Sequence, residues 1–249
     1  MQNCFHRFRR GESPDNYDGI INVRGTIISL ADLTGKMVKP WVDAGYRAVL
    51  VDPQHGTTSD DGRVLRIAGT VLDAAPQLSR TIRTEHVVFV AGFPPCTDVA
   101  VSGARWFAEK AAKDKFFQAK AALIAEQCRM VGLMADCEWM FENPVSVFSS
   151  IFGKPDYTFN PYDFTAYCAD DNYTKKTCLW TSKGFVMPAP FRDESLGAPD
   201  NRIHACPPGD ERANFRSATP EGFAMAVYLA NAPHLKYAND NQPKASAAA

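Results

Sequence analysis

Two apolar runs in this chain end in residues that can do chemistry. The run Val87–Gly92 leads through two prolines to Cys96, and the run 139–141 leads to Glu142, Asn143 and a further proline. Each run is typical of a strand buried in a parallel sheet, which the prolines force to end. Taken alone, Cys96 also fits a small buried hydrophobe. Because ligands bind at the ends of such strands, we predict a nucleophile and an acid at one sheet edge.

Two short motifs resemble those of DNA cytosine-C5 methyltransferases, namely Pro94-Pro95-Cys96 and Glu142-Asn143-Pro144. The resemblance implies methyl transfer from S-adenosyl-L-methionine to C5 of cytosine in DNA. Cys96 would add to C6 of the ring and so activate C5. Glu142, with its pKa raised in a partly buried site, would assist at N3. Asn143 would orient the base edge or the glutamate.

A βαβ pattern precedes the first motif. Residues 25–31 predict a strand, 32–35 a turn, 36–44 a helix and Arg47–Asp52 a second strand that ends in an acid. Asp52 stands 17 positions after Gly35, which suits a carboxylate that accepts the ribose hydroxyls of a nucleoside cofactor. The sequence therefore predicts an α/β protein with a Rossmann-like, S-adenosylmethionine-dependent methyltransferase fold. The same βαβ pattern would also fit the first crossover of any other α/β domain, with no cofactor bound there.

The turn itself is similar to the cofactor turn of the family but departs from it. Ala31 stands where an aromatic is usual, Leu33 and Lys36 stand where glycines are common, and Gly35 remains from the glycine cluster. By resemblance, we expect cofactor contacts from eight residues: Leu30, Asp32, Thr34, Gly35, Asp52, Pro53, Pro94 and Asn231.

A reactive thiolate needs positive charge nearby. Candidates are Lys175, Lys176 and Arg105. The segment 173–180 stands where the family carries a Gln-Arg-Arg type motif, and lysine keeps the charge but loses the bidentate fork. We assign Lys175 to the active site, with Lys176 as the alternative. The alternative is a charged strand edge in which neither lysine has a catalytic role.

The chain after Cys96 has two interpretations. Residues 98–107 resemble a mobile loop that closes over an extruded base, or an ordinary connection from a strand to a helix. Residues 108–135 predict one helix. Seven apolar residues are expected on or around its buried face: Phe116, Ala119, Ala122, Leu123, Cys128, Val131 and Leu133. Its lysines are expected on a solvated face.

Residues 212–223 resemble the late Arg-x-x-Thr-Pro element of the family. Thr219 is expected as the N-cap and Pro220 as the first residue of a helix through Asn231, which returns to cover the cofactor. We therefore divide the chain into an N-terminal extension (1–24), a catalytic core (25–180), a target-recognition-like segment (181–216), a C-terminal helix (217–237) and a disordered tail (238–249). So short a recognition segment resembles phage-type members and implies weak or very short sequence specificity.

The composition of the chain limits which binding partners are expected. The 249 residues are 45% hydrophobic with a net charge of −1, which fits one globular enzyme and a local rather than broad contact with DNA, duplex or single-stranded. Neither a membrane span nor a signal peptide is predicted, so we expect a cytoplasmic monomer in a bacterial host. The seven cysteines form no CxxC pair, and we expect no metal, although Cys168, Cys178, His204 and Cys206 cluster in the last third.

Two alternatives to a DNA methyltransferase remain. The degraded cofactor turn would also suit a protein that kept the fold to bind nucleic acid without catalysis. The same chemistry would also act on RNA or on a free cytidine nucleotide.

Overall fold

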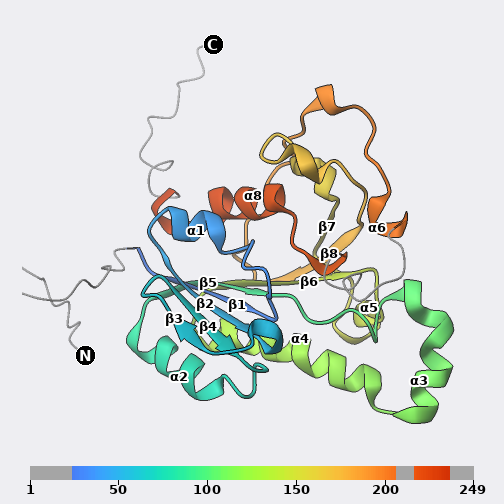
Figure 1. Cartoon of the computed structure of the whole chain (residues 1–249), viewed down its shortest axis with the longest axis horizontal. Helices are drawn as coiled ribbons and strands as arrows, with labels where there is room; N and C mark the ends of the chain where they lie inside the picture. The colour runs from blue at the N-terminus through green and yellow to red at the C-terminus, as the bar shows by residue number, and fades with distance from the viewer. Residues whose placement is uncertain (1–23, 206–215, 236–249) are drawn as a thin grey trace, which may run out of the picture.

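The computed structural model describes residues 24–205 and 216–235. Within them, an eight-stranded sheet lies between two layers of helices (Figure 1). The N-terminal extension to residue 23, the segment 206–215 and the tail beyond 235 lie outside the described residues. The strands are β1 (Thr26–Leu30), β2 (Arg47–Asp52), β3 (Ser59–Asp60), β4 (Val64–Ala68), β5 (Val87–Gly92), β6 (Glu138–Pro144), β7 (Tyr157–Phe159) and β8 (Thr177–Thr181).

The described helices lie on both faces of this sheet and beyond its edges. They are α1 (Lys39–Asp43), α2 (Ala75–Thr84), α3 (Phe107–Lys113), α4 (Phe117–Met134), α5 (Phe148–Ile151), α6 (Arg202–Ala205) and α8 (Glu221–Asn231). Short 3-10 helices span Pro53–His55, Val101–Trp106, Pro161–Phe164, Ala169–Asp171 and Glu194–Leu196.

The strand order of the sheet is β3-β4-β2-β1-β5-β6-β8-β7. Strands β4, β2, β1, β5 and β6 run parallel, whereas β3, β8 and β7 each pair antiparallel with a neighbour. In chain order the parallel strands read third, second, first, fourth and fifth, which is the doubly wound arrangement. The chain therefore has an α/β architecture compatible with a Rossmann-like fold, and its topological switch point lies between β1 and β5.

Alternate residues of the central strands face two separate cores. Ile27 and Phe89 pack with α1 and α8, whereas Ile28 and Val90 pack with α2 and α4. A Cβ built on Gly92 would lie 2.6 Å from Cβ of Cys128, so this strand end must be glycine for α4 to approach β5 so closely. These contacts fix the end of β5, from which the chain leads to Cys96.

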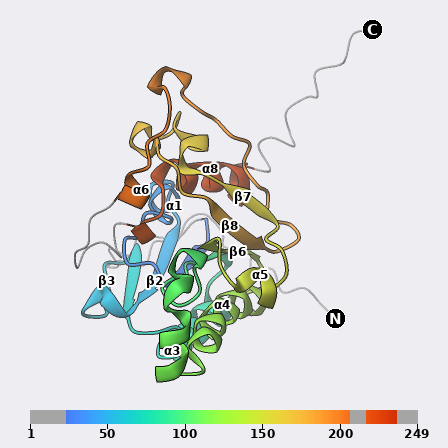
Figure 2. The same ribbon diagram turned by 90° about the vertical axis from the view of Figure 1, so that its right-hand side faces the viewer.

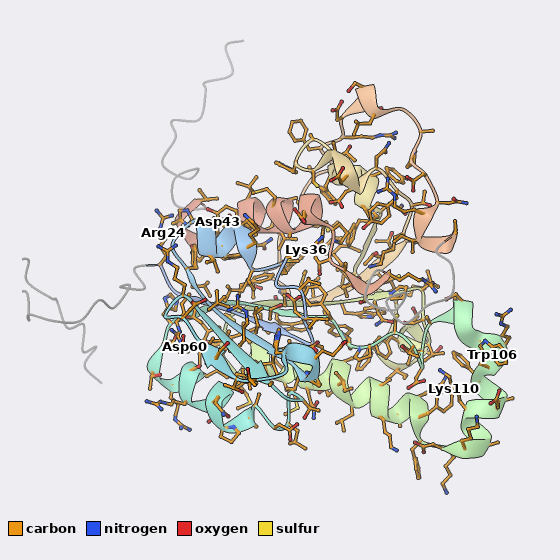
Figure 3. All side chains as sticks on the ribbon, in the orientation of Figure 1. Arg24, Lys36, Asp43, Asp60, Trp106 and Lys110 are labelled. Carbon is orange, nitrogen blue, oxygen red and sulfur yellow. The ribbon has the colours of Figure 1, made fainter. Side chains whose placement is uncertain are left out.

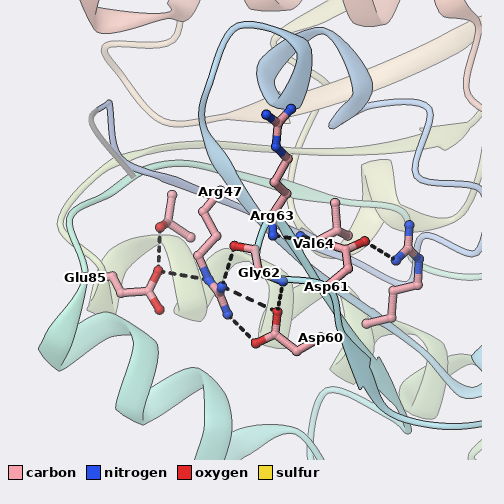
Figure 4. Close-up of polar contacts among 9 residues, drawn as sticks. Arg47, Asp60, Asp61, Gly62, Arg63, Val64 and Glu85 are labelled. Carbon is pink, nitrogen blue, oxygen red and sulfur yellow. Dashed lines mark hydrogen bonds and ion pairs between the residues drawn. The ribbon is translucent and has the colours of Figure 1, made fainter. Parts of the chain in front are cut away.

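A network of ion pairs joins the strands at the amino edge of the sheet (Figure 4). Arg47 begins β2 and donates to Asp60 Oδ2 at 2.8 Å and to the Gly62 carbonyl at 3.0 Å. Its Nε lies 3.5 Å from Glu85, which also accepts from the Thr26 hydroxyl at 2.6 Å. One arginine thus ties the β3–β4 hairpin to the chain that enters β5.

Three helix predictions differ from the structure. The helix expected over 108–135 is two helices, because Asp114 adopts an extended backbone and its Oδ1 accepts from the Phe116 amide at 2.9 Å. Of the residues expected on the buried face, Cys128 and Val131 are buried, together with Ala121, Ala125 and Gly132, whereas Phe116, Leu123 and Leu133 are more than half exposed. The helix expected over 36–44 is shorter and covers only Lys39–Asp43. Helix α2 and strand β7 were not expected.

The N-terminus of α8 is also capped differently from the prediction. Pro220, not Thr219, is the N-cap residue, and no side chain of its own caps the helix. The carboxylate of Asp171 instead accepts a hydrogen bond from the Gly222 amide at 2.7 Å. The group that caps the helix therefore comes from a residue 51 positions before Gly222. A Cβ on Gly222 would lie 2.5 Å from the Phe164 carbonyl oxygen. This glycine lets α8 lie against the preceding segment.

Segments between β6 and α8 form a lobe beyond the α1 and α8 layer, seen in yellow and orange in Figure 1 and from the side in Figure 2. It holds β7, α6 and most of the expected recognition segment. No helix among the described residues is both long and apolar enough to cross a membrane.

Candidate active site

Strand pairing brings the two predicted catalytic segments together. Strands β5 and β6 are parallel neighbours, with Gly92 opposite Phe141. Glu142 follows Phe141 directly, and Cys96 lies four residues after Gly92. Strand β8 pairs antiparallel with β6, with Thr177 opposite Pro144, so the chain just before Thr177 carries Lys175 to the same edge. Three segments distant in sequence therefore meet at one end of the sheet.

Hydrogen bonds tie the Cys96 segment, residues 93–100, to the chain that follows Glu142. Asn143 Nδ2 donates to the Pro94 carbonyl at 2.8 Å. Beyond this bond, the amide of Val101 donates to the Val145 carbonyl and the amide of Val147 to the Val99 carbonyl, both at 3.0 Å. The predicted mobile loop is thus anchored at its base, and its middle is a 3-10 helix over Val101–Trp106.

Cys96 is half-buried and lies among groups of both charges. The pKa of its thiol is raised, chiefly by burial and also by the neighbouring Glu142 carboxylate, and Lys175 and Arg216 only partly oppose this rise. A protonated Glu142 would remove the repulsion and leave the two cations to favour the thiolate. After burial, the charge state of Glu142 therefore has the next largest influence on how readily Cys96 ionises.

Glu142 and Asn143 are buried polar residues with unsatisfied atoms. Glu142 is 9% exposed and Asn143 only 1%. Neither Glu142 Oε2 nor Asn143 Oδ1 has a hydrogen-bond partner among the described residues. Burial raises the pKa of Glu142, and the positive charge of Lys175 only partly opposes this. An unpaired buried polar atom is costly, so a protonated carboxyl and a free amide oxygen are suited to receive a polar ligand.

The structure separates the three candidate cations. Lys175 is 7% exposed and its charge acts on both Cys96 and Glu142. Lys176 is exposed, and its charge acts on Cys178 instead. The Arg105 guanidinium lies over the Trp106 ring, 5.1 Å from its centroid. Arg105 is not among the groups that change the pKa of Cys96. Of the two lysines, Lys175 is therefore the one placed at this edge.

The turn after β1 is held by Asp32. Its Oδ2 accepts from the Ser29 hydroxyl at 2.8 Å, and its Oδ1 accepts from the Gly35 amide at 2.9 Å and the Thr34 hydroxyl at 3.2 Å. Burial raises its pKa, although these three donors oppose the shift. Both oxygens are thus engaged within the turn. Asp32 shapes the turn rather than presenting a free carboxylate to a ligand.

Backbone geometry marks the same turn. Ala31 has a φ of 55°, an uncommon value for a residue with a side chain, and Gly35 has a φ of 66°. Such strain is concentrated at functional sites in proteins. Lys36, in the place of a family glycine, forms an ion pair with Glu221 of α8 at 3.0 Å. The turn is thereby linked to the C-terminal helix.

Other expected cofactor contacts lie near this turn. Asp52 ends β2, is 6% exposed, and accepts from the Gln54 amide through Oδ1 at 2.8 Å. No bond to its Oδ2 is found among the described residues. Leu30 is fully buried and its carbonyl accepts from Phe93 at 2.9 Å, which joins the turn to the Cys96 segment. Pro94 is buried, whereas Pro53 is exposed.

Asn231 does not lie with these residues, contrary to the prediction. It is the last residue of α8, whereas Glu221 at the first turn is the one that meets Lys36. The helix rises about 1.5 Å per residue, so the two ends are about 15 Å apart. Asn231 exchanges hydrogen bonds of 2.9 Å with both backbone groups of Val186. Its amide therefore joins α8 to the chain after β8.

Two residues near Cys96 were missed from the sequence. Arg216 belongs to the late Arg-x-x-Thr-Pro element, which could have singled it out, and its charge lowers the pKa of Cys96. Lys110 was assigned to a solvated face, yet its Nζ donates to the Thr97 carbonyl at 2.8 Å and to Asp98 at 2.7 Å. No local sequence pattern indicates that Lys110 contacts the chain next to Cys96.

Metal ligands do not gather among the described residues, where no group of three His, Cys, Asp or Glu side chains could hold an ion. Cys206, named in the zinc hypothesis, lies outside them. We find no protein-family model that matches the chain and no curated protein of significantly similar sequence.

Proposed function

We propose that this protein transfers a methyl group from S-adenosyl-L-methionine to C5 of cytosine in DNA. One observation carries the proposal: Cys96 and a buried Glu142 with an unpaired oxygen lie at the carboxyl ends of β5 and β6, and a buried Lys175 reaches the same edge just before the antiparallel strand β8. Nucleophilic addition to a cytosine ring needs a thiolate and a proton donor within reach of the same ring. This edge supplies both.

Each residue has a distinct role in the proposed reaction. The Cys96 thiolate adds to C6, and the electron pair of the C5–C6 double bond becomes available at C5. Burial raises the pKa of Glu142 and so favours its protonated form, which donates to N3 and offsets the charge that develops on the ring. Lys175 and Arg216 favour the thiolate. The free Asn143 oxygen suits the exocyclic amine of cytosine.

The remaining steps restore both the base and the enzyme. Carbon C5 takes the methyl group, then loses its proton to a base, and the C6–S bond breaks to regenerate the double bond and the thiolate. The cofactor supplies an electrophilic methyl group on a sulfonium.

Residues after β1 and β2 would hold the cofactor. The buried carboxylate of Asp52, with one oxygen outside the described hydrogen bonds, fits the ribose hydroxyls. The turn 31–35 offers backbone groups next to the Cys96 segment, since Leu30 bonds to Phe93. Asp32 fits less well as a direct ligand because its oxygens are already engaged.

Labelled S-adenosylmethionine tests the proposal. The protein is incubated with duplex DNA, single-stranded DNA, RNA and dCMP, and the digested nucleosides are analysed by mass spectrometry. We expect 5-methyldeoxycytidine from DNA. Transfer only to RNA or dCMP would keep the chemistry and change the substrate. Cofactor binding without transfer to any substrate would contradict the proposal, and loss of both would favour a nucleic-acid-binding protein without catalysis.

A further inference from the structure

A helical arm follows the Cys96 segment and projects from the sheet. We define the α3 arm as residues 101–120, which comprise the 3-10 helix over Val101–Trp106, α3 and the first turn of α4. Helix α3 lies at the right-hand edge of the molecule in Figure 1 and faces the viewer in Figure 2. The arm begins five residues after Cys96. A ligand on the arm would thus lie next to the segment that carries the proposed nucleophile.

Two aromatic rings are exposed on the arm, and each has a cation over it. Trp106 is 50% exposed, with the Arg105 guanidinium 5.1 Å from its ring centroid (Figure 3). Phe116 is 57% exposed, with Lys115 Nζ 4.9 Å from its ring centroid. Exposed rings accompanied by cations are the groups with which proteins stack unpaired bases and contact their phosphates.

The charge of the arm favours the same ligand. It carries five Lys and Arg residues against two carboxylates, a net charge of +3, on a chain whose net charge is −1. Three of its lysines are paired with carboxylates: Lys110 with Asp98, Lys113 with Glu109 and Lys120 with Asp114. Arg105 and Lys115 form no ion pair with a described residue. The two cations left unpaired are therefore the ones beside the exposed rings.

Internal contacts hold the arm in its orientation. Phe107 and Phe117 pack edge to face, with centroids 5.7 Å apart, where α3 meets α4. Lys110 reaches from α3 to the carbonyl of Thr97, the residue after Cys96. Trp106 and Phe116 flank α3 at its two ends. The rings are thus held on a surface connected directly to the catalytic segment, which limits the entropy lost on binding.

We propose that the α3 arm is a docking surface for single-stranded DNA. Unpaired bases stack on Trp106 and Phe116, and Arg105 and Lys115 contact the flanking phosphates. The proposal rests on the proposed function for the choice of DNA and for a target cytosine near Cys96. Bases in a duplex have no free faces, so the arm distinguishes single strands from duplexes.

Fluorescence anisotropy on the full chain tests this surface. The probes are a labelled single-stranded DNA of about 12 nucleotides and a duplex of the same sequence. We expect Trp106→Ala and Phe116→Ala each to weaken single-strand binding about tenfold, which corresponds to about 1.4 kcal/mol, and to leave duplex binding unchanged. Tyr157→Ala on β7, which removes an exposed ring outside the arm and outside the expected recognition segment, is the matched control and should change neither.

Salt dependence tests the two cations. Because each phosphate contact on a single strand contributes about 0.7 to the slope of log K against log salt, Arg105→Ala with Lys115→Ala should lower that slope by about 1.4. Arg80→Ala with Arg83→Ala on α2 is the control. Unchanged thermal melting would show that the variants fold, as expected for exposed side chains.

Three outcomes would overturn the docking surface: single-strand affinity unchanged in both ring variants, an equal loss of duplex affinity, or tighter ring-dependent binding of the corresponding RNA. Methyl transfer, measured in parallel, separates the two proposals. Transfer that persists without ring-dependent binding removes the docking surface alone. Ring-dependent binding without any transfer supports the surface and contradicts the proposed reaction.

Discussion

The two ends of the sheet differ in how their charged groups are paired. At the amino edge, Arg47 donates to Asp60 and to a carbonyl. Its Nε has no hydrogen-bond partner among the described residues but lies 3.5 Å from the carboxylate of Glu85, which also accepts from Thr26 (Figure 4). At the carboxyl edge, Glu142 and Asn143 are more deeply buried, yet each has an oxygen without a partner among the described residues.

This difference separates a structural network from a site. Pairing satisfies charged groups and holds strands together, whereas unpaired buried atoms reduce stability and are retained where they serve a ligand or a reaction. If that interpretation is correct, substitutions at the carboxyl edge change activity more than stability, and substitutions at the amino edge do the reverse.

The largest effect is expected from Cys96→Ala. Without the thiolate no addition to C6 occurs, so methyl transfer should fall by about 10,000-fold or more in the labelled-methyl assay, with thermal melting unchanged. Cys168→Ala removes another partly exposed thiol and should leave the rate unchanged. A Cys96→Ala protein with normal turnover would exclude the covalent mechanism.

Glu142→Gln should lower kcat by about 100-fold to 10,000-fold, because the proton donated to N3 is lost while the shape of the side chain is kept. Calorimetry should find cofactor affinity unchanged. If affinity falls as much as kcat, Glu142 holds the cofactor and not the base.

Lys175→Met should lower methyl transfer at neutral pH by about tenfold, because this buried cation lowers the pKa of Cys96 and so favours the thiolate. The pH dependence of Cys96 alkylation, followed by mass spectrometry, should move to higher pH. Lys176→Met at the neighbouring exposed position is the matched control. Equal effects of the two substitutions would mean that general surface charge, not position, is responsible.

Arg47→Met should destabilise the fold by about 1–2 kcal/mol in urea denaturation, because Asp60 and Glu85 lose a shared partner. The methyl-transfer rate of the folded protein should not change. Arg63→Met, at an exposed position in the same hairpin, should affect neither quantity. If folded Arg47→Met protein lost methyl-transfer activity, the amino edge could no longer be distinguished from the carboxyl edge as purely structural.

The smallest effect concerns pH and stability. The pKa of Glu142 is raised above 4.5, so the folded state binds this proton more tightly than the unfolded state does. Its contribution to stability is fully present below pH 4.5 and is lost as pH rises through the folded pKa. The melting temperature of Glu142→Gln relative to the parent should therefore rise as the pH increases above 4.5. A constant difference would mean that Glu142 ionises as it does in water.

Local sequence was enough to place the strands and the chemical groups at their ends. The runs that begin at Arg47 and Val87 are apolar because both faces of a central parallel strand are buried. The structure has the first strand with the predicted bounds, Arg47–Asp52, and a strand Val87–Gly92 within the second run. Proline after each catalytic strand marks where the chain must leave the sheet. Local sequence alone therefore predicts that Cys96, Glu142 and Asn143 are neighbours.

Tertiary contacts decided what local patterns leave open. The antiparallel register of β8 against β6, together with the local backbone, places Lys175 inside and Lys176 outside. Asp171 caps α8 from 51 positions away, and Asp114 divides one expected helix into two. Asn231 was misplaced because its distance from the site depends on the direction of α8. In each case the deciding partner is distant in sequence or lies in a side-chain bond that periodicity does not record.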